Sequence, residues 1–127
     1  MGEKEIFQTD KAAVTGGPYS QAVIHNGLIY ISGQVAFDPE NNQVRLGTIE
    51  EESELALENI RIILEEAGSS LDKVLKVTVY LLDVEEFGRF NDVYKKYFTK
   101  DLPARTSIQA GKLPLGIRVE IDAIAYI

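Results

Sequence analysis

Residues 102–127, which read LPARTSIQAGKLPLGIRVEIDAIAYI, predict two apolar strands that each carry a charged side chain. Arg105 stands in the first strand and Glu120 in the middle of the second. Because side chains alternate between the two faces of a strand, Arg105 shares a face with Ser107, and Glu120 shares one with Asp122. Each strand is therefore predicted to have a polar face. That face is typical either of surface ion pairs or of a site for a small charged substrate.

Further strands are expected in the first three quarters of the chain. Alternating or continuous apolar runs predict strands over residues 5–8, 20–25, 28–37 and 74–82, in addition to 105–110 and 117–126. Asn26-Gly27 separates the second and third of these runs, and this dipeptide is a strong hairpin signal because both residues tolerate positive φ. In the strand over 74–82, Leu75, Val77, Val79 and Leu81 are expected to line one face. Gly33 is expected to mark a bulge or a close backbone approach.

Two helices are expected between these strands. Thr48 and Glu51 form a predicted capping box for a helix over 48–67, which Gly68 would end. Its apolar stripe consists of Ala56, Ile60, Ile63, Leu64 and Ala67. Asp83 and Glu86 suggest a second capping box, followed by a helix with an aromatic stripe of Phe87, Phe90, Tyr94, Tyr97 and Phe98. Its helical spacing favours a core role over a base-stacking one.

The order of elements predicts a single α+β domain over residues 1–127. The chain has 127 residues, of which 45% are hydrophobic, so it can bury a core. Both helices can cover one face of a mixed sheet in a two-layer arrangement. The opposite face is also apolar, for example over 29–31 and 77–80, so contact between copies of the chain through the sheet is expected.

Composition excludes several classes of function. The net charge of −7 and the absence of a basic run disfavour binding to nucleic acid. There is no cysteine and only one histidine, so neither a thiolate metal site nor a two-histidine metal site is expected. His25 is best explained as an exposed residue beside the hairpin turn. The N-terminus lacks a secretory signal and no membrane-spanning run is present, so a soluble cytoplasmic protein is expected.

The polar residues near the closing strands suggest how a site could work. Arg105 offers a planar fork that matches a carboxylate, and Glu120 can position a water or move a proton when partly buried. Ser32 and Ser107 can donate or accept hydrogen bonds. Tyr19, which follows two glycines and a proline in a loop, can form a wall or lid.

Several segments together resemble the RidA/YjgF family of reactive intermediate deaminases. The similar segments, in chain order, are Gly17-Pro18-Tyr19-Ser20-Gln21-Ala22, Ile31-Ser32-Gly33-Gln34, Lys76-Val77-Thr78-Val79-Tyr80-Leu81, Asn91 before Tyr94, Pro103-Ala104-Arg105, Leu113-Pro114, and Val119-Glu120-Ile121-Asp122-Ala123-Ile124-Ala125. They extend from about Ile6 to Tyr126.

The resemblance implies a chorismate-mutase-like α+β fold and a homotrimer with three clefts between subunits. It also implies the activity of a 2-iminobutanoate/2-iminopropanoate deaminase, a hydrolase that converts 2-imino or 2-enamino acids, such as 2-aminoacrylate, to 2-oxo acids and ammonia. No metal or cofactor is implied. Arg105 would bind the substrate carboxylate and Glu120 would hold or activate the attacking water. Tyr19, Ser32, Gly33 and Asn91 would shape the cleft.

One residue departs from the family pattern. Many members of the family carry cysteine where this chain has Ser107, so a hydrogen bond from a hydroxyl is possible there but a thiol-specific role is not. Two other functions stay open as hypotheses. One is non-catalytic binding of small 2-oxo acids or other carboxylates in the same clefts. The other is endoribonuclease activity or inhibition of translation, which the net charge disfavours.

Overall fold

The computed structural model describes residues 2–127, which form two helices and eight strands. The helices are α1 (Ile49–Glu66) and α2 (Phe87–Tyr97). The strands are β1 (Glu5–Phe7), β2 (Ala22–His25), β3 (Leu28–Gln34), β4 (Phe37–Asp38), β5 (Gln43–Val44), β6 (Val74–Leu81), β7 (Ala104–Gln109) and β8 (Val119–Tyr126). Short 3₁₀ turns lie at Leu71–Lys73, Val84–Glu86 and Pro114–Gly116.

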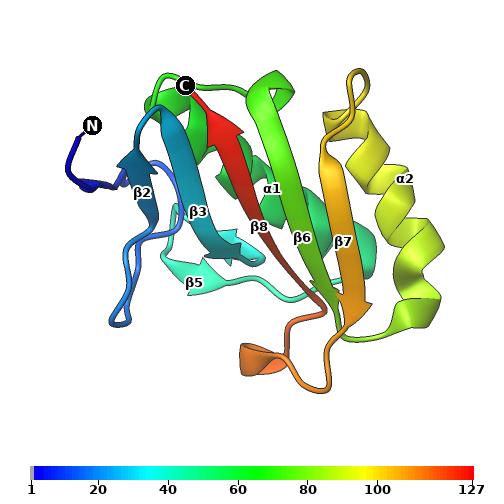
Figure 1. The fold of residues 1–127 in the computed structure, drawn as a ribbon. Helices are drawn as coiled ribbons and strands as arrows, with labels where there is room; N and C mark the ends of the chain where they lie inside the picture. Colours follow the sequence, from blue (N-terminus) through cyan, green and yellow to red (C-terminus); the bar gives the residue numbers. More distant parts are fainter. Residues whose placement is uncertain (1) are drawn as a thin grey trace.

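Six of the strands form one mixed sheet, whose order is β1-β2-β3-β8-β6-β7 (Figure 1). β7 runs parallel to β6, to which α2 connects it, and all other neighbours in this sheet are antiparallel. β8 therefore lies in the middle of the sheet and β7 at one edge. β4 and β5, which were not predicted as a pair, form a separate small hairpin.

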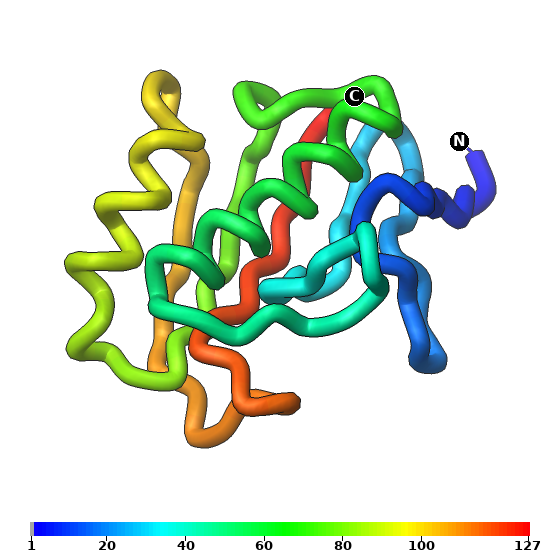
Figure 2. Tube along the Cα trace, turned by 180° about the vertical axis from the view of Figure 1, so that it is seen from behind, coloured from blue at the N-terminus to red at the C-terminus, as the bar shows by residue number. Residues whose placement is uncertain are grey.

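Both helices pack on the same face of the sheet, as Figure 2 shows from behind. This confirms the predicted α+β arrangement of two layers. The core between the layers includes Leu57, Ile60 and Leu64 of α1, together with Val77 and Ile121 of the sheet. Burying a side chain of this size contributes roughly 1.5–3 kcal/mol to stability, so this layer holds the two closing strands firmly in place.

The start of α1 has the predicted capping box. The Glu51 backbone N–H donates to Thr48 Oγ1 at 3.2 Å, and the Thr48 backbone N–H donates to Glu51 Oε1 at 2.9 Å. Gly68, directly after the helix, has φ of +88°, so its predicted role at the helix end is also confirmed. Of the predicted apolar stripe, Ala67 is only partly buried.

The predicted second capping box is wrong. Asp83 accepts a hydrogen bond from the backbone N–H of Glu85, at 2.9 Å, and so caps the 3₁₀ turn that precedes α2. α2 itself begins at Phe87 without a side-chain cap. Its aromatic residues stack along the helix, with ring centroids 5.6 Å apart for Phe90 and Tyr94 and 4.7 Å apart for Tyr94 and Phe98.

Two irregularities interrupt the sheet. The pairing of β6 with β8 shifts between Val74 and Lys76, so Leu75 has no partner and is 46% exposed. The prediction that Leu75 lines the same face of the strand as Val77 is therefore wrong. The pairing of β3 with β8 shifts between Ile31 and Gln34, which confirms the predicted bulge at Gly33. The hairpin turn is also confirmed, since Asn26 and Gly27 have φ of +50° and +78°.

The face of the sheet away from the helices carries an apolar row. Cross-strand pairing aligns Ile6, Val23, Tyr30 and Ile124 over four strands, and Tyr30 is 42% exposed. Within residues 2–127 nothing packs over this row, because both helices lie on the opposite face. In the same range no helix has the length and apolar character needed to cross a membrane.

Candidate active site

Arg105 lies on edge strand β7 and faces the helices. It pairs with Val77 of β6, and paired residues on neighbouring strands point to the same side of a sheet. The guanidinium rests on the aromatic residues of α2, with Arg105 Cζ 4.6 Å from the ring centroid of Tyr94, 5.7 Å from that of Phe90 and 5.8 Å from that of Phe87. Cation–π contacts of this kind hold the guanidinium group in place without neutralising its charge.

Within the part of the chain that the structure describes, Arg105 differs from the other arginines because it has no carboxylate partner. Arg45 pairs with Asp38, Arg61 with Glu58 and Glu65, Arg89 with Glu50, and Arg118 with Glu86. Among residues 2–127, Arg105 forms no salt bridge. An arginine always carries its charge, so this guanidinium is free to bind an external anion through two parallel hydrogen bonds.

A cavity of about 290 Å³ opens beside Arg105, lined by Asn91, Tyr94, Lys95, Leu102, Pro103 and Arg105. Two of its lining residues carry a buried polar atom without a hydrogen-bond partner in the described part of the chain, Asn91 Oδ1 and Tyr94 OH. A third such atom, Ser107 Oγ, belongs to the residue that shares a face of β7 with Arg105. Burial raises the pKa of Tyr94 against an opposing effect of Arg105, so its hydroxyl keeps its proton at neutral pH. Buried polar groups are normally paired, so this cluster is typical of a binding site.

Glu120 lies on the central strand β8 and points to the other side of the sheet. It pairs with Tyr80 of β6, whose hydroxyl donates to Asp122 Oδ2 at 3.1 Å. A cavity of about 400 Å³ adjoins it, lined by Tyr19, Ser32, Gly33, Val35, Pro114, Leu115 and Glu120; we call it the glutamate cavity. Burial, and secondarily the nearby charge of Asp122, raise the pKa of Glu120. A carboxylate with a raised pKa is a better proton acceptor, which suits a general base.

The bulge in β3 makes room for this carboxylate. A Cβ placed on Gly33 would overlap Glu120 Oε2 and would lie 2.9 Å from Glu120 Cδ, so only glycine fits here without moving the glutamate. The neighbouring Ser32 hydroxyl donates to the Ser20 carbonyl oxygen at 2.6 Å. Its only proton is thereby used, so Ser32 can offer a ligand just an acceptor oxygen.

The predicted site residues thus fall into two groups within one chain. Tyr19, Ser32, Gly33 and Glu120 line one cavity, whereas Asn91 and Arg105 line the other, and Ser107 shares a face of β7 with Arg105. The two cavities share no lining residue and lie on opposite sides of the sheet. Alternation along each strand gave the polar faces correctly, but it did not reveal that the two faces point in opposite directions.

Some site residues were not predicted as such. Helical spacing indicates only a core role for the aromatic stripe of α2, but Phe87, Phe90 and Tyr94 also contact the Arg105 guanidinium. Leu115 lines the glutamate cavity from the Pro114–Gly116 turn and has φ of +61°, which is uncommon for a leucine. The Pro-Leu-Gly sequence signals a turn there, but no sequence pattern indicates which cavity it borders.

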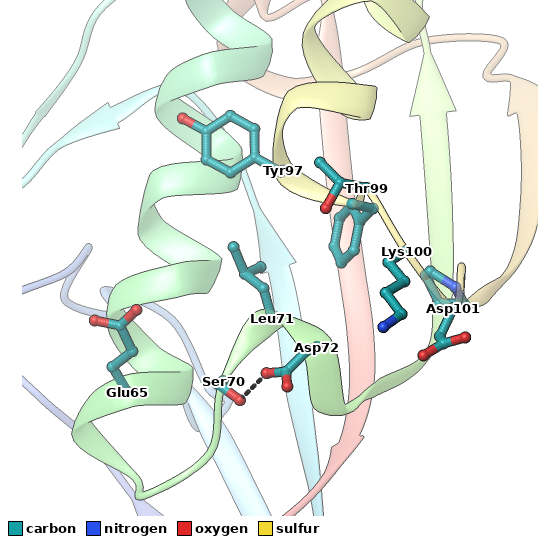
Figure 3. A pocket seen from close by; sticks show the side chains of 10 residues that line it. Glu65, Ser70, Leu71, Asp72, Tyr97, Thr99, Lys100 and Asp101 are labelled. Carbon is teal, nitrogen blue, oxygen red and sulfur yellow. Dashed lines mark hydrogen bonds between the residues drawn. The ribbon is translucent and has the colours of Figure 1, made fainter.

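A further cavity, of about 310 Å³, lies where α1, the Leu71–Lys73 turn and the end of α2 meet (Figure 3). Two of its polar groups are bonded within the chain: the Ser70 hydroxyl pairs with Asp72, and the Tyr97 hydroxyl donates to Glu58 Oε2 at 2.9 Å. It lacks the unpartnered buried groups that surround Arg105. Nowhere in residues 2–127 do three histidine, cysteine, aspartate or glutamate side chains cluster closely enough to hold a metal ion.

The chain is similar in sequence to proteins of several organisms. The family model described as Endoribonuclease L-PSP matches residues 9–127. A RutC family protein of Pyrococcus abyssi is 45% identical, with 97% of each chain covered. The 2-iminobutanoate/2-iminopropanoate deaminase of Mus musculus is 48% identical, with 96% of this chain and 90% of the mouse protein covered.

Solved structures agree with this relationship. The crystal structure of RidA from the Antarctic bacterium Psychrobacter sp. PAMC 21119 has a TM-score of 0.92 and 43% identity, and covers 97% of this chain and 99% of that one. Escherichia coli TdcF with bound serine has a TM-score of 0.91 and 32% identity, and covers 97% of this chain and 98% of that one. The chain therefore belongs to the RidA/YjgF family, whose family model is described as Endoribonuclease L-PSP.

Proposed function

We propose that the protein hydrolyses reactive 2-imino acids, and the enamines in equilibrium with them, to 2-oxo acids and ammonia. The observation that carries this proposal is Arg105, the one arginine without a carboxylate partner among residues 2–127, held on aromatic rings beside a cavity. A 2-imino acid supplies the missing carboxylate. The mammalian relatives named 2-iminobutanoate/2-iminopropanoate deaminase, such as the mouse protein at 48% identity, support the same activity.

The reaction needs a water, a base and a fixed substrate. Arg105 binds the carboxylate and so fixes the position of C2, which is electrophilic in the protonated imine. Glu120 accepts a proton from a water as the water oxygen bonds to C2, which gives a 2-amino-2-hydroxy acid. Glu120 then gives this proton to the nitrogen and the C–N bond breaks. The hydroxyl proton passes to the departing ammonia, which leaves as ammonium, and the product is a 2-oxo acid. Orientation and proton transfer account for the catalysis, and the cycle returns Glu120 to its ionised form.

Because Arg105 and Glu120 point to opposite sides of the sheet, one chain cannot bring them together on one small substrate. We infer that the site forms between copies of the chain in a homotrimer, with Arg105 from one copy and Glu120 from its neighbour. The apolar row of Ile6, Val23, Tyr30 and Ile124, left uncovered within the described chain, is available for such contacts. Closed symmetric assemblies of this kind repeat one contact around an axis.

The activity can be tested with imines made in the reaction vessel. An L-amino acid oxidase converts alanine to 2-iminopropanoate, and semicarbazide traps the imine that remains. The protein is expected to speed the loss of imine over buffer and to produce one ammonia per 2-oxo acid. A rate equal to that in buffer, with a folded protein, would reject the proposal.

Gly33→Ala is expected to lower kcat/KM about tenfold or more, because the added Cβ displaces the Glu120 carboxylate, and a small misplacement of a catalytic group is costly. Thermal unfolding would show whether the fold is retained. Gly88→Ala is the matched control, since a Cβ at Gly88 meets no atom within 4 Å and Gly88 lies on α2 away from Glu120. Equal activities of the two variants would contradict the role assigned to Gly33.

Binding of small carboxylates without turnover is a second candidate function. The E. coli TdcF structure, described with bound serine, favours it, because serine carries a carboxylate of the same kind. Calorimetry with 2-oxobutanoate measures the binding, and the imine assay measures the turnover. Binding that Arg105→Ala abolishes, together with no catalysis, would establish this second candidate in place of the first.

A further inference from the structure

The glutamate cavity continues into a second cavity of about 420 Å³. Both cavities are lined by Tyr19, Gly33, Val35 and Leu115, so they meet along a shared wall. The second cavity extends from there over residues 13–17, Phe37 and Asn42. We call it the side cavity. A molecule bound beside Glu120 can therefore extend into the side cavity.

The walls of the side cavity are apolar or uncharged. Apolar surface comes from Ala13, Val14, Val35, Phe37 and Leu115. The polar side chains that line the cavity, those of Thr15, Tyr19, Gln34 and Asn42, carry no charge. Among residues 2–127, the only charged residue that lines either of the two joined cavities is Glu120. A charged group in the side cavity would lose its hydration without gaining an ion partner, which is costly.

Two residues at the shared wall are exposed. Leu115 is 69% exposed and has a backbone conformation of positive φ, and Tyr19 is 57% exposed. Covering large exposed apolar side chains with a ligand is favourable, because apolar surface is removed from water. An apolar group that passes between the cavities would cover both residues.

We propose that the side cavity receives the side chain of the substrate, and that the protein therefore prefers 2-imino acids with large apolar side chains, such as those derived from leucine and phenylalanine. This inference rests on the proposed function: with the carboxylate on Arg105 and C2 beside Glu120, the side chain is the remaining group of the substrate. The reaction is the same for every side chain, since water adds to C2, the C–N bond breaks and ammonia leaves.

The experiment compares four imines made by oxidation of alanine, leucine, phenylalanine and glutamate. The imines from leucine and phenylalanine are expected to have a kcat/KM about tenfold or more above that of 2-iminopropanoate, because each methylene in an apolar pocket changes kcat/KM by about 10-fold to 200-fold. The glutamate-derived imine is similar in length to the leucine-derived one but charged. It is expected to be at least about tenfold slower than the leucine-derived imine.

Gly16→Leu tests whether the substrate side chain lies in the side cavity. Gly16 lines this cavity, and a Cβ at Gly16 meets no atom within 4 Å. The added side chain would occupy the cavity, so the ratio of kcat/KM for the leucine-derived imine to that for 2-iminopropanoate should fall about tenfold. Gly88→Leu, also in open space but on α2, is the matched control and should keep the ratio of the unmodified protein.

The outcomes separate the inference from the function on which it rests. Hydrolysis of 2-iminopropanoate with no preference for large side chains, or a ratio that Gly16→Leu leaves unchanged, overturns the side-chain assignment and leaves the deaminase proposal standing. Failure to hydrolyse any of the four imines overturns both.

Discussion

Replacing Arg105 with alanine is expected to lower kcat/KM for 2-iminopropanoate by about a hundredfold to a thousandfold. The guanidinium has no carboxylate partner in residues 2–127, so its hydrogen bonds would be made to the substrate carboxylate. Hydrogen bonds to charged groups contribute about 1.5–3 kcal/mol each, and about 1.4 kcal/mol corresponds to a factor of ten. The loss should appear mainly in KM and in the Kd for 2-oxobutanoate, since the carboxylate is bound in substrate and transition state alike.

Two further arginine variants make this test specific. Arg105→Lys keeps the charge but loses the planar fork, so it should fall between the unmodified protein and Arg105→Ala. Arg89→Ala removes an arginine whose partner, Glu50, lies at the surface, and should leave kcat/KM unchanged. Full activity of Arg105→Ala in the imine assay would remove the basis of the proposed function.

Glu120→Gln is expected to lower kcat by about 10²-fold to 10⁴-fold, the usual contribution of a general base, with little change in KM. The amide is nearly the same size as the carboxylate but cannot accept the proton of the attacking water. Glu54→Gln, on the exposed side of α1, is the control for the same change of charge. A Glu120→Gln variant with unchanged kcat would show that the carboxylate only shapes the cavity.

The pH dependence gives an independent test of the role of Glu120. Burial and then Asp122 raise its pKa, and a general base works only when ionised. Activity is therefore lost as pH falls through this raised pKa, so the acid limb of kcat/KM should lie at higher pH than for an ordinary glutamate. Asp122→Asn removes the neighbouring negative charge and should move the limb to lower pH. An acid limb that stays in place in that variant would contradict the assignment.

Local signals in the sequence predicted much of the fold. The Asn26-Gly27 hairpin, the Thr48–Glu51 capping box and the bulge at Gly33 each depend on residues close together in the chain, and all are confirmed. The predictions that are wrong concern residues whose structure is determined by contacts with residues far away in the sequence. Leu75 is turned outward by the shift in pairing between β6 and β8, and this depends on a strand some 50 residues further along.

The residues of the candidate site could be predicted from the sequence, but their arrangement in space could not. Family resemblance identified Arg105, Glu120 and their neighbours, and the structure gathers these residues around two cavities. The direction in which each side chain points depends on the register of β7 and β8 against β6, which the sequence of either strand does not contain. The aromatic support of Arg105 was missed because helical spacing indicates burial and does not reveal what lies on the outer side of the rings.

The most direct test of the shared site is to mix two inactive variants. Arg105→Ala and Glu120→Gln chains, each with its own purification tag, are co-expressed, and assemblies that carry both tags are isolated. Each variant supplies the residue that the other lacks, so every trimer that contains both variants should have one complete site, about a third of its sites. Activity well above that of either variant alone is the predicted result. Mixed assemblies as inactive as their parents would contradict a site built from Arg105 of one copy and Glu120 of another.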